Sequence, residues 1–257
     1  MELKKSLGQH FLHDENMLRK IADLMGNFAE FASVLEVGPG HGALTKYLLQ
    51  KNIPHFQAVD VDVRCVEFLR QNFPQLMVHH KDFLKADLFE LLQAPACVVG
   101  NFPYNISSQI VFHILEYKEL VLEMTGMFQK EMAVRIAASH NNKDYGVISV
   151  LTQAYYDCEY LLDIPPSCFN PPPKVMSGII RIKRKKEALG CDEKLFRRVV
   201  KQVFTQRRKM LSNSLKPILQ NMKLSDEKYS SLRPEQLSVA DFVQLTNLIS
   251  EAQIKNV

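Results

Sequence analysis

The chain has 257 residues, of which 46% are hydrophobic and 23% charged, and its formal net charge is +4 at pH 7. This composition is typical of a globular protein, and no run approaches the roughly 18 apolar residues that span a bilayer. The start of the chain has no long apolar run, and the five cysteines include no C-x-x-C pair. We therefore expect no secretory signal, no metal site, no membrane association, reduced thiols and a cytoplasmic location.

Helical and strand patterns alternate over the first half of the chain. An apolar helical period covers residues 14–31, and a short apolar run predicts a buried strand at 33–37 that leads directly into glycines. Further strands are predicted at 55–59, 76–79 and 96–99, and further helices at 43–49, 63–71, 108–115 and 130–139. This alternation predicts an α/β fold with a doubly wound sheet.

The second half changes character. Late strands are predicted at 145–155 and 178–182, with a proline-rich loop at 164–174 between them. Beyond residue 185 the patterns are helical, and the predicted helices cover residues 193–205, 208–219 and 239–252. We therefore predict a catalytic domain at residues 1–187 and a smaller all-helical domain at residues 188–257.

A glycine-rich turn, Glu-Val-Gly-Pro-Gly-His-Gly, follows the first predicted strand at residues 36–42. Gly38 and Gly40 lack a Cβ atom, so a ligand can approach this backbone closely, and the next helix directs its amide groups toward it. A tight strand-to-helix turn without a ligand explains the same residues. With Ala43 the turn also fits the dinucleotide pattern G-x-G-x-x-A, so the turn alone does not select a cofactor.

Two acidic residues follow the next predicted strands. Asp60 lies about 20 residues beyond the glycine turn, where a carboxylate accepts hydrogen bonds from ribose hydroxyls. Asp82 follows the third predicted strand, where a side chain can reach an adenine amine. These positions predict a nucleotide-binding crevice at the carboxyl edge of the sheet. A nicotinamide enzyme needs a hydride-handling site as well, and the sequence offers none.

The segment Asn101-Phe102-Pro103-Tyr104 follows the fourth predicted strand. Pro103 restricts Phe102 to an extended backbone, so the Phe102 carbonyl can point out of the chain. This carbonyl and the Asn101 side-chain oxygen could each accept one N–H of an aromatic amine, while Tyr104 stacks on the ring. Together with the glycine turn, the segment predicts methyl transfer to a base nitrogen, in which positioning carries most of the catalysis. A turn with a buried tyrosine is the alternative.

Phe169 lies in the proline-rich loop with prolines on both sides. A stiff loop could hold its ring against the second face of the same base. The alternative is that the ring packs into the protein core.

Positive charge is concentrated in one stretch, where residues 181–216 contain thirteen Lys or Arg and three acids, an excess of 13 − 3 = +10. Phosphate contact explains this concentration better than solubility does, although a solvated helix face remains an alternative. The predicted RNA-binding residues are Arg197, Arg198, Arg207, Arg208 and Lys209. Binding through phosphates should weaken steeply with salt.

Five ordered blocks along nearly the whole chain resemble a known family, the ribosomal RNA adenine dimethyltransferases, and specifically the small-subunit enzymes of the kasugamycin-sensitivity type. These blocks are residues 5–12, 36–42, 101–107, 165–175 and 204–209. The resemblance implies a Rossmann-like class I methyltransferase sheet and S-adenosyl-L-methionine as methyl donor. It implies dimethylation at N6 of two adjacent adenines in small-subunit rRNA, with a pre-30S particle as partner, and we expect a monomer.

The resemblance also implies roles for single residues. It places the donor among His10, Leu12, Gly38, Asp60, Asp82 and Asn101, and the target base between Tyr104 and Phe169. His10, Asp60 and Phe102 depart from the usual asparagine, glutamate and leucine. Because Phe102 is expected to act through its carbonyl, its side chain should matter little.

Three alternatives remain. A large-subunit rRNA methylase of the macrolide-resistance type resembles the chain in fold and tetrapeptide, but the prolines at 171–173 and the block at 206–209 favour the small-subunit enzyme. A ribosome-assembly binding factor would not need the intact turn and tetrapeptide. A protein-glutamine methyltransferase would not need the basic stretch.

Overall fold

The computed structural model describes residues 10–219 and 227–254. Its contacts divide the chain into two compact units, the first formed by residues 1–134 and 157–184 and the second by residues 135–156 and 185–257. The prediction placed residues 135–156 with the catalytic domain, whereas the contacts group this segment with the C-terminal helices. The chain thus passes between the two units three times.

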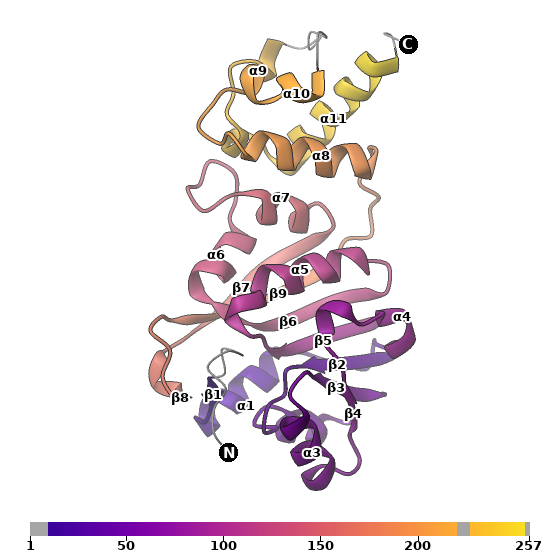
Figure 1. The fold of residues 1–257 in the computed structure, drawn as a ribbon, viewed down its shortest axis with the longest axis vertical. Helices are drawn as coiled ribbons and strands as arrows, with labels where there is room; N and C mark the ends of the chain where they lie inside the picture. Colours follow the sequence, from indigo (N-terminus) through magenta and orange to yellow (C-terminus); the bar gives the residue numbers. More distant parts are fainter. Residues whose placement is uncertain (1–9, 220–226, 255–257) are drawn as a thin grey trace. The chain divides into compact units, whose positions relative to one another are not determined.

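The first unit is built on a seven-stranded sheet with the order β4-β3-β2-β5-β6-β9-β7 (Figure 1). The strands are β2 (Ser33–Val37), β3 (Phe56–Asp60), β4 (Met77–His80), β5 (Ala96–Asn101), β6 (Val121–Gln129), β7 (Tyr156–Ile164) and β9 (Ser177–Arg184). Strands β2 to β6 pair in parallel, and β9 pairs antiparallel to β6. The strand order reverses between β2 and β5, which is the place where open α/β sheets bind ligands. The predicted α/β fold is confirmed.

The helices of the first unit follow the strands as the sequence pattern requires. They are α1 (Glu15–Leu24), α2 (Thr45–Leu48), α3 (Val63–Asn72), α4 (Leu88–Leu91), α5 (Ser107–Glu116) and α6 (Lys130–Ala137), whose last residues belong to the second unit. The side chain of Asp14 caps α1 by accepting from the Met17 amide at 2.9 Å. Every residue of β2 is buried, as expected for a central parallel strand covered on both faces.

A second, two-stranded sheet connects distant parts of the first unit. Strand β1 (Phe11–Leu12) pairs antiparallel with β8 (Phe169–Asn170), and Leu12 lies opposite Phe169. The start of the described chain is thereby joined to the proline-rich loop.

The second unit is helical. It contains α7 (Val147–Gln153), α8 (Glu193–Phe204), α9 (Leu211–Ser214), α10 (Lys216–Leu219) and α11 (Val239–Ile254). Helix α8 is capped by Asp192 and buries Phe196, Val199, Val200 and Val203 along one face. Among the described residues, we find no helix with the length and apolar character that crossing a membrane requires.

Several predicted elements were wrong. Residues 145–155 were predicted as a strand, but residues 147–153 form helix α7, in which residues 148–152 are all buried. A short, continuous apolar run does not distinguish a buried strand from a buried helix. The predicted helix at 14–31 ends at Leu24, and that at 208–219 is divided into α9 and α10. Strands β6 and β7 were missed, because polar residues interrupt their apolar patterns.

Candidate active site

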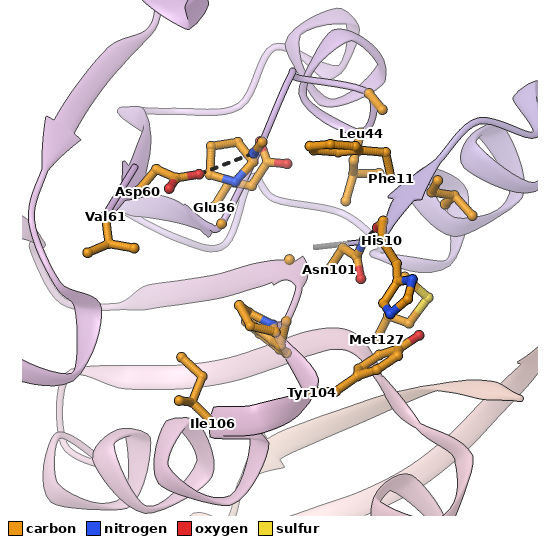
Figure 2. Close-up of a pocket in the computed structure, with 18 of the residues that line it drawn as sticks. His10, Phe11, Glu36, Leu44, Asp60, Val61, Asn101, Tyr104, Ile106 and Met127 are labelled. Atoms are coloured by element: carbon orange, nitrogen blue, oxygen red, sulfur yellow. Dashed lines mark hydrogen bonds between the residues drawn. The ribbon is translucent and has the colours of Figure 1, made fainter. Parts of the chain in front are cut away.

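A cavity of about 280 Å³ lies at the carboxyl ends of β2, β3 and β5, within the first unit (Figure 2). It is lined by His10, Phe11, Leu12, Leu18, Ile21, Glu36, Gly38, Pro39, Gly40, Ala43, Leu44, Asp60, Val61, Asp82, Leu84, Gly100, Asn101, Phe102, Pro103, Tyr104, Asn105, Ile106 and Met127. Every predicted donor-site residue is in this set. Figure 2 shows His10, Asn101 and Tyr104 on one side of the cavity and Asp60 and Val61 on the other.

The glycine turn forms one wall of the cavity. Gly38 and Gly40 have φ angles of +67° and +57°, in the left-handed region that side chains disfavour. A Cβ atom on Gly40 would come within 2.9 Å of Phe11 Cε1. Backbone conformation and close packing both require glycine here, so the turn leaves its backbone open to a ligand.

Asp60 fixes the turn and faces the cavity. Its Oδ2 accepts from the Gly40 amide at 3.3 Å, and its Oδ1 accepts from the Asp62 amide at 2.8 Å. Burial raises the pKa of Asp60, and the hydrogen bonds from these amides oppose that rise. Each carboxylate oxygen keeps a further lone pair, so the side chain can still accept hydrogen bonds from two hydroxyl groups of a ligand.

The predicted adenine-binding residue Asp82 caps a short 3₁₀ helix, where it accepts from the Leu84 amide at 3.1 Å. Three apolar side chains that the sequence analysis missed lie on the same cavity, namely Val61, Leu84 and Ile106. Val61 is 52% exposed although it is hydrophobic. Each of the three lies within two residues of a predicted site residue, and this proximity along the chain was the signal that could have identified them. Figure 2 shows Val61 and Ile106 on the same side of the cavity as Asp60, where apolar side chains can contact a flat ring.

Glu36 was also missed as a site residue. Its side chain is buried, and its Oε2 accepts from the Thr45 hydroxyl at 2.7 Å. Burial raises the pKa of Glu36 to about 7, with the Thr45 hydrogen bond lowering it and Asp60 raising it. This hydrogen bond joins the end of β2 to the start of α2, the two elements on either side of the glycine turn.

Asn101 is the last residue of β5, and its side chain has a defined orientation. Its Nδ2 donates to the backbone oxygen of His10 at 3.3 Å. Because a carbonyl oxygen only accepts, the amide NH2 faces His10 and Oδ1 is left for another donor. The predicted amine acceptor therefore has an available oxygen on the cavity.

Phe102 corrects one expectation. Its ring is buried against Phe128, with the ring centroids 4.9 Å apart, and it covers the positions where Cβ atoms on Gly100 and Gly126 would lie. The expectation that this side chain matters little is therefore wrong, because the ring supports the backbone of the tetrapeptide. The Phe102 amide donates to the Met127 oxygen at 3.2 Å, which holds the same backbone to β6.

Tyr104 lines the cavity and is anchored at both ends of its side chain. Its hydroxyl is hydrogen-bonded to Ser177 Oγ at 2.5 Å, and its ring stacks on His10 with centroids 5.6 Å apart at an angle of 27°. Burial raises the pKa of its hydroxyl. A ring held in this way can form a fixed stacking surface.

Phe169 occupies a different place from the one predicted for a base-flanking residue. It is only 2% exposed and packs in a core cluster with Leu12, Met127 and Ile179. It is not among the residues that line the cavity. In this structure the Phe169 ring therefore packs into the protein core, as the alternative interpretation expected.

The start of the chain contributes to the cavity through His10, Phe11 and Leu12. The remainder of the first resembling block, residues 5–9, lies outside the described residues. Phe11 was not predicted, and its ring stacks on His41 with centroids 4.6 Å apart. The burial of His41 lowers the pKa of its imidazole.

The basic residues of the second unit differ in their surroundings. Lys194, Arg197, Arg198 and Lys201 are exposed and share one face of α8, since they recur at helical spacing. Arg208 and Lys209 are also exposed. Arg207 instead donates to the Asn142 oxygen at 3.2 Å and lies 4.0 Å from a Glu235 carboxylate oxygen. Within the second unit, α8 thus presents a cationic surface, and Arg207 also has a structural role.

Comparison with known proteins identifies the family of this chain. The family model described as ribosomal RNA adenine dimethylase matches residues 1–251. The ribosomal RNA small subunit methyltransferase A of Cytophaga hutchinsonii is 50% identical, over 97% of this chain and 98% of its own. That of Bacteroides thetaiotaomicron is also 50% identical, over 97% and 94% of the two chains.

Two solved structures share the fold. A dimethyladenosine transferase from Plasmodium falciparum aligns with a TM-score of 0.80 at 24% identity, covering 96% of this chain and 99% of the other. The 23S rRNA methyltransferase ErmE aligns with a TM-score of 0.67 at 25% identity, covering 93% and 99% of the two chains. With a family match over nearly its whole length and relatives at half identity, the chain belongs to the ribosomal RNA adenine dimethylase family.

Proposed function

We propose that this protein transfers methyl groups from S-adenosyl-L-methionine to N6 of two adjacent adenines in small-subunit rRNA, twice at each. The observation that carries the proposal is the oriented amide of Asn101 beside a cavity with an open glycine turn. The relatives at 50% identity are named as small-subunit methyltransferases, which favours this rRNA over the large-subunit one.

The residues of the cavity suit the methyl donor. The turn at Gly38 and Gly40 admits a ligand to the backbone, Asp60 keeps lone pairs for the ribose hydroxyls, and Val61 and Ile106 offer apolar contact to the adenine ring. Asp82 lines the same cavity, and its carboxylate can accept from the adenine amine. The donor, when bound, supplies a methyl group on a positively charged sulfur that is already strongly electrophilic.

The protein then needs to position the target amine rather than to remove a proton from it before the transfer. In the first transfer, Oδ1 of Asn101 and the carbonyl oxygen of Phe102 each accept one N–H of the target amine, which directs the nitrogen lone pair toward the methyl donor. In the second transfer the amine has a single N–H left, which one of these two oxygens accepts. After each transfer the methylated nitrogen releases one proton to water. Tyr104 supports the base by stacking. Holding the reacting atoms in line can account for a large part of the rate enhancement.

The second unit supplies RNA affinity. The exposed residues on α8, together with Arg208 and Lys209, contact phosphates, and the target base leaves its stack to reach the cavity. The described part of one chain carries both the cavity and the basic helix, which favours action as a monomer. We expect the enzyme to act in the cytoplasm on rRNA within a pre-30S particle.

The test is incubation of the protein with labelled S-adenosyl-L-methionine and either 30S or 50S particles that lack the modification. Nucleoside analysis of the 30S rRNA should show N6,N6-dimethyladenosine, and the 50S rRNA should remain unlabelled. Label confined to the 50S rRNA would identify the large-subunit methylase instead. Binding of pre-30S particles without any label would identify an assembly factor.

A further inference from the structure

His10 contacts three other residues, two of which, Asn101 and Tyr104, line the cavity. Its backbone oxygen accepts from Asn101 Nδ2 at 3.3 Å, and its ring stacks on Tyr104 with centroids 5.6 Å apart. Its Nδ1 lies 2.9 Å from the backbone oxygen of Pro171. Because this oxygen only accepts, Nδ1 carries the proton. Figure 2 shows the His10 ring beside Tyr104, on the opposite side of the cavity from Asp60.

We propose that the side chain of His10 is a positioning residue for the target base rather than a ligand of the methyl donor. The inference rests on the proposed function, since it assigns Asn101 and Tyr104 to the target amine and its ring. In this role His10 acts through those two residues. Its imidazole anchors its own backbone, and the anchored carbonyl holds the Asn101 amide with Oδ1 on the cavity.

The orientation of the Asn101 amide decides whether the site accepts or repels an amine. With NH2 facing His10, Oδ1 can accept an N–H of the target. A flipped amide would direct two N–H donors at the target amine and leave Oδ1 against the His10 oxygen, where two acceptors repel. The carbonyl of His10 therefore selects the productive orientation, provided that it stays in place.

Two contacts of the imidazole, one with Pro171 and one with Tyr104, hold the His10 carbonyl in place. The Pro171 hydrogen bond ties it to the segment that follows Phe169, and β1 pairs with β8 immediately beyond. The Tyr104 ring lies against the imidazole, and Ser177 holds the Tyr104 hydroxyl. One side chain thus couples Asn101, Tyr104 and the β8 segment.

The neighbouring residue, Phe11, is assigned to the methyl donor instead of the target base. Phe11 stacks on His41 and lies against the Gly40 backbone, so its ring supports the glycine turn on the donor side. Successive side chains of an extended segment point in opposite directions, which explains how adjacent residues serve different sides of the cavity. Phe11 therefore provides a matched comparison for His10.

The experiment compares the full-length wild type with His10→Ala, His10→Asn, His10→Phe and Phe11→Ala. Asparagine keeps an N–H donor for Pro171 without the ring, whereas phenylalanine keeps a ring for Tyr104 without the donor. Calorimetry with S-adenosyl-L-methionine alone measures the dissociation constant of the donor and shows that each variant is folded. Single-turnover methylation of unmodified 30S particles at saturating donor measures the transfer step.

For His10→Ala we expect the single-turnover rate to fall about tenfold, which corresponds to about 1.4 kcal/mol in the barrier. The Asn and Phe variants should fall between it and the wild type, and all three should bind the donor within about twofold of the wild type. Phe11→Ala should instead weaken donor binding, and saturating donor should restore most of its rate.

A His10→Ala variant that transfers at the wild-type rate with saturating donor would overturn the inference. So would a loss of donor affinity in His10→Ala as large as that in Phe11→Ala. Failure of the proposed function has a different signature, because the wild type itself would then form no N6-methylated adenosine in 30S particles.

Discussion

Tyr104 makes two contributions that substitutions can separate. Its hydroxyl bonds to Ser177, and its ring is available for stacking on the target base. Tyr104→Phe should keep most of the methylation rate, because the ring remains. Tyr104→Ala should lose base stacking of about 1–3 kcal/mol, or roughly 5- to 150-fold in rate. Methylation kinetics with 30S particles measures both, and equal rates for the two variants would remove the ring from the base site.

Glu36 predicts how stability depends on pH. Its pKa rises from an ordinary 4.5 to about 7 in the folded protein, so the folded state holds this proton more tightly than the unfolded state. The stabilisation is complete below pH 4.5 and is lost as pH rises through about 7. The loss is on the order of 3 kcal/mol for a shift of this size.

Glu36→Gln removes this titration and keeps an oxygen that accepts from Thr45. The free energy of unfolding of the variant, from urea denaturation at pH 5 and pH 8, should therefore fall less between the two values than that of the wild type. An unchanged difference between pH 5 and pH 8 would show that Glu36 does not hold its proton in the folded state.

At this scale the sequence predicted residues whose chemistry is tied to motif spacing. Gly38, Asp60 and Asn101 line one cavity because each lies at, or directly after, the carboxyl end of a parallel strand. Glu36 and Phe102 were misjudged, since their importance depends on burial and on neighbours from α2 and β6. Such tertiary neighbours cannot be read from spacing along the chain.

Among the elements, β6 makes room for the Phe102 ring of the tetrapeptide, because its residue Gly126 has no side chain. A Cβ atom on Gly126 would lie 2.1 Å from the Phe102 ring, so Gly126→Ala must displace that ring or its strand. We expect destabilisation of about 1–3 kcal/mol, as for overpacked cores, and a lower methylation rate. Thermal unfolding and single-turnover kinetics measure the two effects.

Gly146 offers a matched control within the same chain. A Cβ atom there would meet nothing within 4 Å, and its φ of −160° is open to any residue. Gly146→Ala should therefore leave stability nearly unchanged. Equal losses in the two variants would mean that the contact between Gly126 and Phe102 is not the cause.

The elements also show where periodicity stops being informative. Strand β5, which begins with a continuous apolar run, was predicted correctly, whereas the largely apolar helix α7 was taken for a strand. Strand β6 was missed because Glu123 and Thr125 interrupt its pattern although both are buried. Their burial beside Arg181 on β9 is a property of the assembled sheet.

At the level of the whole molecule, we propose that chemistry and RNA affinity reside in separate units. Part of the basic stretch belongs to the sheet, where Arg181 pairs with Glu123 and Arg184 with Glu119. The cations on α8 are exposed and available for phosphates. The sequence predicted the concentration of charge but not this division, because it depends on which element carries each residue.

The double variant Arg197→Ala/Arg198→Ala should bind small-subunit rRNA more weakly and with less salt dependence. Each lost phosphate contact should reduce the slope of log affinity against log salt by about 1. Lys228→Ala is the control, since this exposed lysine already pairs with Asp241 at 3.2 Å. Fluorescence anisotropy over a range of KCl concentrations measures the slopes, and equal slopes for the two variants would place RNA binding elsewhere.

The central claim is that Asn101 accepts the target amine beside the methyl donor, while other residues bind the RNA. Nucleoside analysis of unmodified 30S particles after incubation with donor and either wild type or Asn101→Ala tests it most directly, with particle binding measured in parallel. The account predicts dimethyladenosine from the wild type, none from the variant, and similar binding by both. Near-normal dimethylation by Asn101→Ala would contradict it.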